Sequence, residues 1–332
     1  MMNVDFFAEA NRQKRLETLN SMLPRLNKSV NWEKFRPPLH AAVRTADHSK
    51  GGRPPYDEVM MFKVLILQRL YGLSDDQAEY QINDRLSFQR FLGLTLSCKV
   101  PDAKTIWLFR EQLVKANVMD LLFGLFHNEL EGQGLIAHEG VLLDATFVQV
   151  PKRHDKGGEK ELIAEGEIPE DWSDNKLSQK DLDARWTKKR NQSYFGYKNH
   201  VKVDSASKLI ADFCVTTANV HDSQVVDFLV DHSDDSVWAD SAYIGISFPE
   251  GVIPYICERA TRNHPLTPEQ KSRNKVVSTT RSRVEHVFGQ IKMQMGGTFC
   301  RTIGMARARF HVTMLNLVYN MSRAEFLTRN TV

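Results

Sequence analysis

The sequence predicts an α/β protein, in which a mixed sheet flanked by helices follows an all-helical region of helix-turn-helix type. Apolar residues recur at helical spacing in the first third of the chain, β-branched apolar runs begin near residue 141, and helical periodicity returns at the end. The 332 residues, 42% of them hydrophobic, suffice for two domains. We expect a helical domain over residues 1–135 and a sheet domain over residues 136–332, with a charged insertion at about 152–190.

The helical region contains one strongly amphipathic segment and several shorter ones. After Pro54 and Pro55, apolar residues recur at helical spacing until Gly72, which is a stop signal. Ser74 then has the position of an N-cap. A succession of short helices is typical of helix-turn-helix DNA-binding domains and also of plain helical bundles, so both interpretations stay open.

The strand pattern begins at Val141. Residues 141–150 are apolar and β-branched. Two more strands are expected at residues 196–203 and 209–217, and residues 204–208 between them predict a hairpin turn. The remaining expected elements are a helix from about residue 222, short strands at 236–240 and 251–257, and helices at about 279–295 and 305–327. Hairpin strands followed by crossovers predict a mixed sheet with helices on its faces.

The composition excludes several classes of protein. No apolar stretch approaches the roughly 18 residues of a membrane helix, and the N-terminus lacks the apolar core of a signal peptide, so we expect a cytoplasmic protein. The four cysteines match neither a clustered metal site nor a disulfide framework. The sequence has no glycine-rich phosphate loop for a nucleotide and no serine-hydrolase elbow.

The net charge of +3 conceals a segregation of sign along the chain. Residues 203–258 carry −9, whereas residues 259–332 carry +10. Residues 184–202 carry six cations and no acid, with aromatic side chains among them. This pattern suits contact with nucleic acid, and a strand edge guarded by lysines is the alternative.

Three carboxylates occupy positions that suggest chemistry. Asp144 lies in the middle of an apolar strand, and Asp240 ends another, where ligands bind in open sheets. Glu285 lies on the first C-terminal helix, with Arg281 one turn before it and Lys292 about two turns after it on nearly the same face. A surface salt bridge between Arg281 and Glu285 would explain Glu285, but it would leave the two strand aspartates unexplained.

Carboxylates from two strands and a helix can together hold divalent metal ions. Such ions activate a water or hydroxyl and stabilise the leaving oxygen in the displacement of a phosphodiester. Oxygen ligands without clustered cysteines favour Mg²⁺ or Mn²⁺ over Zn²⁺. We therefore predict Asp144, Asp240 and Glu285 as catalytic residues and as the ligands of two such ions.

Five short blocks of the sequence carry a resemblance to a known family. They are LDAT at 143–146, GYKNH at 196–200, TANVHD at 217–222, ADSAY at 239–243 and RVEH at 283–286. They resemble the conserved blocks of bacterial insertion-sequence DDE transposases of the insertion-sequence-5 family, and GRPPY at 52–56 is similar to that family's N-terminal domain. The family signature Y-(2)-R-(3)-E-(6)-K falls on Ser278, Arg281, Glu285 and Lys292, with a serine in place of the tyrosine.

The resemblance implies an RNase H-like catalytic domain whose triad is Asp144, Asp240 and Glu285. It implies that water cuts a strand at the end of the element, and that the freed 3′-hydroxyl attacks target DNA in the same site. The implied partners are double-stranded DNA, as terminal inverted repeats and target, and a second copy of the chain on that DNA. The implied location is the bacterial cytoplasm, in association with the nucleoid.

Further residues are candidates for DNA contact or for auxiliary roles. The DNA-contact candidates are Arg281, Lys292, Lys198, His200, Lys188, Lys189 and Arg190, and the auxiliary candidates are His221, Asp222 and Trp238. For His221 and Asp222 a structural hydrogen bond or helix cap is the alternative, and for Trp238 it is a place in the core. Two other functions stay open, namely an RNase H-like nuclease that cuts without joining and a DNA-binding regulator with an inactive site.

Overall fold

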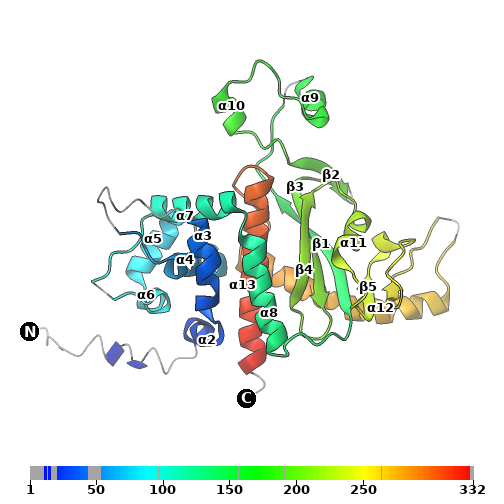
Figure 1. Cartoon of the computed structure of the whole chain (residues 1–332). Coiled ribbons are helices and arrows are strands. Elements are labelled where there is room, and N and C mark those ends of the chain that lie inside the picture. Colours follow the sequence, from blue (N-terminus) through cyan, green and yellow to red (C-terminus); the bar gives the residue numbers. More distant parts are fainter. Residues whose placement is uncertain are drawn as a thin grey trace, which may run out of the picture. The chain divides into compact units, whose positions relative to one another are not determined.

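The structure is a computed structural model that describes residues 11–12, 14–15, 21–43, 54–95, 97–155, 157–189, 191–262 and 264–329 (Figure 1). The described residues form two compact units, the helical unit within residues 1–126 and 320–332 and the sheet unit within residues 127–319. The sequence instead placed the division at residue 135. The two divisions differ because helices α8 (Met119–Gly132) and α13 (Met305–Arg329) each contain residues of both units.

The helical unit is built from short helices. Before α8 they are α2 (Met22–Ser29), the 3-10 helix η1 (Trp32–Phe35), α3 (Arg36–Ala42), α4 (Glu58–Tyr71), α5 (Asp75–Asp84), α6 (Leu86–Leu92) and α7 (Ala103–Ala116). None of the helices in the described chain is both long and apolar enough to cross a membrane.

The helix signals in the sequence around α4 and α5 are confirmed. Gly72 ends α4 in the left-handed conformation, at a φ of 63° that glycine adopts without strain. The Ser74 hydroxyl accepts a hydrogen bond from the Gln77 amide, and the Gln77 side chain accepts one from the Ser74 amide. This reciprocal capping box satisfies two backbone donors at the start of α5.

The sheet unit contains a six-stranded mixed sheet, as the sequence predicts. Its strands are β1 (Val141–Gln149), β2 (Arg185–Lys189), β3 (Gln192–Asp204), β4 (Ile210–Thr217), β5 (Ser236–Ala239) and β6 (Ile253–Ile256). The order is β2-β3-β1-β5-β6, and β4 also pairs with β3. β3 runs antiparallel to β1, β2 and β4, whereas β5 runs parallel to β1 and β6. β2 is an addition to the predicted strands.

The sheet unit also contains helices, one of which packs against three of its strands. In the sheet unit they are α9 (Glu159–Glu165), α10 (Asp174–Ser178), η3 (Asp222–Val225), α11 (Val226–Leu229), η4 (Ser241–Tyr243), α12 (Pro268–Gln294) and most of α13. α12 contacts β1, β5 and β6. It begins well before the predicted start near residue 279, because Thr267 forms a capping box with Gln270 and Pro268 occupies the first turn.

Alternation along β1 directs its side chains to two separate cores. Val141 and Leu143 pack with Val226 and Leu229 of α11. Val148 packs instead with Val312 of α13 and its neighbours. Because successive strand residues point to opposite faces, Asp144 and Val148 share the face opposite to that of Leu143.

The GYKNH block forms the centre of β3, where it makes close contacts on both sides. Gly196 has a φ of 145°, and a Cβ atom there would lie 2.3 Å from the Val148 carbonyl oxygen, so only glycine fits. Asn199 and Asn316 of α13 exchange amide hydrogen bonds of 2.8 and 3.2 Å, and both side chains are buried. Each buried amide therefore satisfies the other, and the pair fixes α13 against the sheet.

The charged insertion between β1 and β2 is anchored at its end. The buried Asp181 carboxylate accepts hydrogen bonds from the Tyr197 hydroxyl at 2.8 Å and from the Gly304 amide at 3.1 Å. Asp183 likewise accepts from the Met305 amide at 2.8 Å, at the start of α13. The acidic residues at this end of the insertion thus satisfy backbone donors at a helix N-terminus, where negative charge is favourable.

Candidate active site

The three predicted carboxylates lie on elements that the fold places side by side. Asp144 is in the middle of β1, and Asp240 directly follows β5, the parallel neighbour of β1. Glu285 lies on α12, which contacts both strands. Residues that are 141 positions apart in the sequence, Asp144 and Glu285, are thereby brought to one side of the sheet.

Arg281 joins two of these carboxylates. Its Nη1 atom lies 3.1 Å from Asp144 Oδ2, and its Nη2 atom lies 3.4 Å from Glu285 Oε1. Asp144 Oδ1 accepts a hydrogen bond of 2.8 Å from the Ala145 amide. The salt bridge between Arg281 and Glu285, which is the alternative interpretation of Glu285, is therefore present. Arg281 also forms an ion pair with Asp144 on β1.

Asp240 is held by the turn that follows β5. Its Oδ1 atom accepts a hydrogen bond of 2.8 Å from the Ala242 amide, and this makes Asp240 the N-cap of η4. The cap fixes one carboxylate oxygen toward the backbone. The three residues directly after Asp240 form this turn as η4.

Burial raises the pKa of Asp144 to about 6, and the nearby negative charge of Asp240 contributes in the same direction. The Ala145 amide, Arg281 and Lys189 oppose the rise. A buried carboxylate whose pKa is raised by a second negative charge lies in a site that added positive charge stabilises.

Two lysines lie within electrostatic range of Asp144. Burial lowers the pKa of Lys292, the Asp144 charge opposes this, and the Lys189 charge adds to it. Lys292 lies on α12, with its Nζ atom 5.6 Å from the centre of the Phe288 ring. Lys189 ends β2 and is exposed. Cations from two separate elements therefore lie within electrostatic range of Asp144.

Lys198 and His200, two predicted DNA-contact residues, are buried. The Lys198 ammonium donates to the Val220 carbonyl at 2.6 Å and to Asp222 Oδ1 at 2.9 Å. His200 Nε2 lies 2.8 Å from Thr216 Oγ1, and His200 Nδ1 lies 3.6 Å from Asp222 Oδ1. The structure therefore places both residues inside the protein, next to the auxiliary candidate Asp222, and not at an exposed surface.

His200 gives the unfolding free energy a specific dependence on pH. Burial lowers its pKa from 6.5 to about 4, so the folded state binds this proton less tightly than the unfolded state does. The folded state therefore loses stability as the pH falls from about 6.5 toward 4, by on the order of 3 kcal/mol in total.

We expect His200→Gln to lose less stability than the wild type between pH 7 and pH 4 in urea unfolding. The same change at the exposed His232 is the control, and equal pH profiles for His200→Gln and the wild type would contradict the assignment.

The remaining candidates have varied surroundings. Lys188 is exposed on β2, and Arg190 lies outside the described residues, as do Gly52 and Arg53 of the N-terminal block. His221 Nδ1 accepts a hydrogen bond from the Ser223 amide, which is the helix cap considered as its alternative.

Trp238, the auxiliary candidate two residues before Asp240, packs against an aromatic residue of the neighbouring strand. The rings of Trp238 and Tyr255 stack with their centres 4.2 Å apart, on the neighbouring strands β5 and β6. Ser278, which occupies the tyrosine position of the signature, has its Oγ atom 3.6 Å from Cys257 Sγ. Neither contact points to nucleic acid.

Tyr243 is a residue beside the carboxylates that the sequence did not single out. Its side chain is buried in the core beneath α11. Burial raises its pKa, and the negative charges of Asp222, Asp144 and Asp240 raise it further, so the hydroxyl lies within electrostatic range of all three. The signal was its place in the ADSAY block, but a tyrosine there is equally compatible with an ordinary core residue.

The donor chemistry of the three carboxylates fits a divalent cation such as Mg²⁺ or Mn²⁺, which prefers oxygen ligands. As they stand, the described residues include no group of three His, Cys, Asp or Glu side chains close enough to hold a metal ion. In this structure the cation that forms ion pairs with both Asp144 and Glu285 is Arg281.

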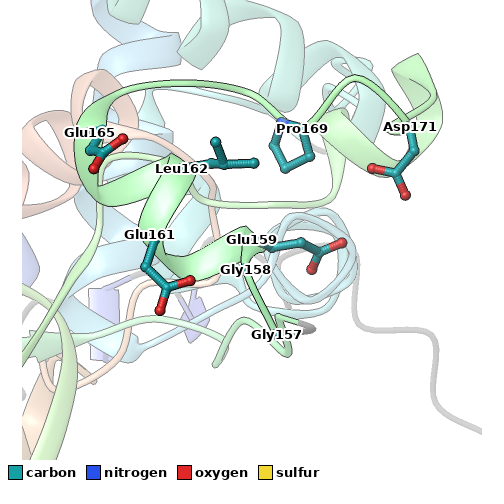
Figure 2. Close-up of a pocket in the computed structure, with 8 residues that line it drawn as sticks. All are labelled: Gly157, Gly158, Glu159, Glu161, Leu162, Glu165, Pro169 and Asp171. Carbon is teal, nitrogen blue, oxygen red and sulfur yellow. The ribbon is translucent and has the colours of Figure 1, made fainter.

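A separate pocket of about 520 Å³ lies in the charged insertion (Figure 2). Its charged lining is acidic, and Figure 2 shows Leu162 and Pro169 between these carboxylate side chains. The lining consists of Gly157, Gly158, Glu159, Glu161, Leu162, Glu165, Pro169 and Asp171. A pocket with this charge repels phosphates, and it contains none of the three predicted catalytic residues.

Comparison with protein families places these features in context. Residues 11–112 match a transposase domain (DUF772), and residues 136–321 match a transposase DDE domain. No solved structure matched the chain. The second match covers more than half of the chain and includes all three carboxylates. The helical region followed by a mixed sheet with flanking helices is consistent with the RNase H-like fold of DDE transposases. The chain therefore belongs to the insertion-sequence DDE transposases, which bind DNA and are metal-dependent enzymes of DNA cleavage and strand transfer in transposition and recombination.

Proposed function

We propose that this chain is a transposase of the insertion-sequence-5 family that cuts the ends of its element and joins each freed 3′-hydroxyl to target DNA. The reaction we propose is two-metal-ion phosphoryl transfer at Asp144, Asp240 and Glu285. The observation that carries the proposal is the bridge from Asp144 through Arg281 to Glu285. It unites the central strand and α12 in one charged site next to Asp240.

The carboxylates would hold the metal, and the surrounding cations would hold DNA. Bound Mg²⁺ or Mn²⁺ would supply positive charge for the oxygens that attack and leave. Lys292 and Lys189 border Asp144 from two elements, and we propose that they bind the phosphates that flank the scissile bond. Lys188, on the same exposed strand as Lys189, and Arg190 after it extend this surface in the proposal.

Lys198 and His200 have an indirect role in the proposal. Lys198 fixes Asp222 and the Val220 carbonyl, and these lie in the segment that leads into η3. η3 contacts η4, which begins directly after Asp240. We propose that the two buried residues of β3 help to place the turn that carries Asp240. His221, as the cap of η3, contributes to the same segment.

We further propose that two copies of the chain act together on DNA in the bacterial cytoplasm, associated with the nucleoid. An element has two ends, and both must be joined to one target. One active site on each copy would serve one end, as the symmetry of a two-fold assembly permits.

The test of the proposed function is strand transfer with labelled DNA that carries an end of the element. In the presence of Mg²⁺ we expect nicked ends and also products joined to a target plasmid, and chelation of the metal with EDTA should remove both. Cutting without joining would instead favour an RNase H-like nuclease. DNA binding without metal-dependent cutting would favour a regulator with an inactive site.

A further inference from the structure

Arg281 contacts carboxylates on two elements at once. Its guanidinium lies 3.1 Å from Asp144 Oδ2 and 3.4 Å from Glu285 Oε1. The side chain is 20% exposed, so water surrounds it only in part. Its Nε atom is buried and makes no hydrogen bond within the described structure. The two Nη atoms of the guanidinium thus contact carboxylate oxygens, whereas the Nε donor is unused.

A metal ion at this site would share with Arg281 the carboxylates of Asp144 and Glu285. Asp144 Oδ1 accepts from the Ala145 amide, so Oδ2, which faces Arg281, is the oxygen without a backbone donor. Two cations on one carboxylate repel each other, and the repulsion is stronger where water is partly excluded. The described carboxylates do not yet form a group close enough to hold an ion. The guanidinium and a divalent ion therefore compete for Asp144 and Glu285.

We propose that Arg281 provides the positive charge of the active site in the metal-free protein, and that a divalent ion displaces it and frees it to bind a DNA phosphate. The inference rests on the proposed function. It adds a coupling between metal binding and DNA binding, because the metal frees Arg281 to contact a phosphate. A guanidinium has five donors in a planar fork that matches a phosphate, and Nε is already unused. By thermodynamic linkage, metal and DNA then raise each other's affinity by the same factor.

An orienting role for Arg281 predicts the opposite sign. If the guanidinium only held Asp144 and Glu285 in place for the metal, its removal would disorder the ligands and weaken metal binding. If it competes with the metal, its removal strengthens metal binding in the absence of DNA. The direction of the change in metal affinity therefore separates the two roles, whatever the catalytic rate of the variant.

The experiment measures Mn²⁺ binding to the full DNA-free chain by isothermal titration calorimetry. We expect Arg281→Gln to bind Mn²⁺ about five- to tenfold more tightly than the wild type. Arg273→Gln is the matched control, because it removes the same charge from the same helix at a side chain that is 57% exposed and 3.9 Å from Glu258. It should bind Mn²⁺ nearly as the wild type does. Unchanged or weaker binding by Arg281→Gln would overturn the inference.

A second measurement follows the released guanidinium to DNA. With Ca²⁺ present, the wild type should bind a generic DNA duplex with a salt dependence steeper by about one phosphate contact than in EDTA. In Arg281→Gln the slopes with Ca²⁺ and with EDTA should be equal, and a slope that steepens as in the wild type would contradict the proposal.

Two further variants keep this inference distinct from the proposed function. If Asp144→Asn and Asp240→Asn bind Mn²⁺ as the wild type does, the metal does not bind at these carboxylates and the proposed function fails with the inference. If both variants lose Mn²⁺ binding while Arg281→Gln does not gain affinity, the inference alone fails.

Discussion

Replacing Asp240 with asparagine is expected to reduce metal-dependent DNA cleavage by about a thousandfold or more, because one of the three proposed metal ligands then loses its charge. Asparagine has nearly the same shape, and its side-chain oxygen can still accept the hydrogen bond from the Ala242 amide that caps η4. The fold of the turn should therefore persist. The measurement is the rate of nicking of labelled element-end DNA at saturating Mg²⁺, together with the thermal unfolding midpoint of both proteins.

The control for this loss is Asp227→Asn, which removes the same charge from the same acidic segment. Asp227 is exposed in the first turn of α11 and belongs to none of the contacts around Asp144. We expect it to retain nearly full cleavage. Wild-type cleavage by Asp240→Asn would rule out the proposed triad, and an equal loss in Asp227→Asn would show that general charge, not a ligand, is responsible.

Replacing Lys198 with methionine is expected to destabilise the protein by about 3 kcal/mol, because it leaves Asp222 in a partly buried position without its cation. The side chains of Lys198 and Asp222 are only 10% and 17% exposed, so water can compensate little for the lost pair. The free energy of unfolding in urea measures this loss. Affinity for duplex DNA, measured by fluorescence anisotropy under conditions where both proteins are folded, should change little.

The matched variant for Lys198 is Lys189→Met, at an exposed lysine on the neighbouring strand β2. It should barely change the unfolding free energy, whereas it should weaken DNA binding and reduce the salt dependence by about one contact. A Lys198→Met protein of normal stability that has lost DNA affinity would reverse the roles we propose for the two lysines.

The charge of the acidic segment has a different meaning in the structure than in the sequence. Residues 203–258 carry −9, and the sequence alone does not show which of these charges are paired. Part of it is paired with two lysines of β3. Lys198 binds Asp222 at 2.9 Å, and Lys202 binds the buried Asp234 at 2.8 Å. Charge counts along a chain therefore overstate what remains for a ligand, because the fold brings neighbouring segments of opposite sign together.

The local elements could be predicted where the signal is local. The turn at residues 204–208, the caps of α4 and α5 and the β-branched run of β1 depend on residues close in sequence, and each was found. β2 is not predicted as a separate strand because its five residues, three of them cations, carry little apolar signal. The start of α12 was missed because its first turns lack an apolar stripe, and only the capping box at Thr267 marks it.

The residue types and spacing of the candidate site could also be predicted, because they follow from the free-energy cost of burying charge and from the helical period. A carboxylate in the middle of an apolar strand is expensive unless it is used, which singled out Asp144. The helical period placed Arg281, Glu285 and Lys292 near one face of one helix. The roles of these residues as ligands and DNA contacts remain predictions that the experiments above address.

The sequence by itself determined the elements, their mixed parallel and antiparallel character and the candidate carboxylates, because these follow from periodicity, capping and the cost of burying charge. The tertiary structure decided which charges meet. It paired Lys198 with Asp222 inside the protein, and it placed Arg281 between Asp144 and Glu285. The physical reason is that a pattern fixes the face on which a side chain lies, whereas its partner depends on which distant segment the sheet order and helix packing bring against that face.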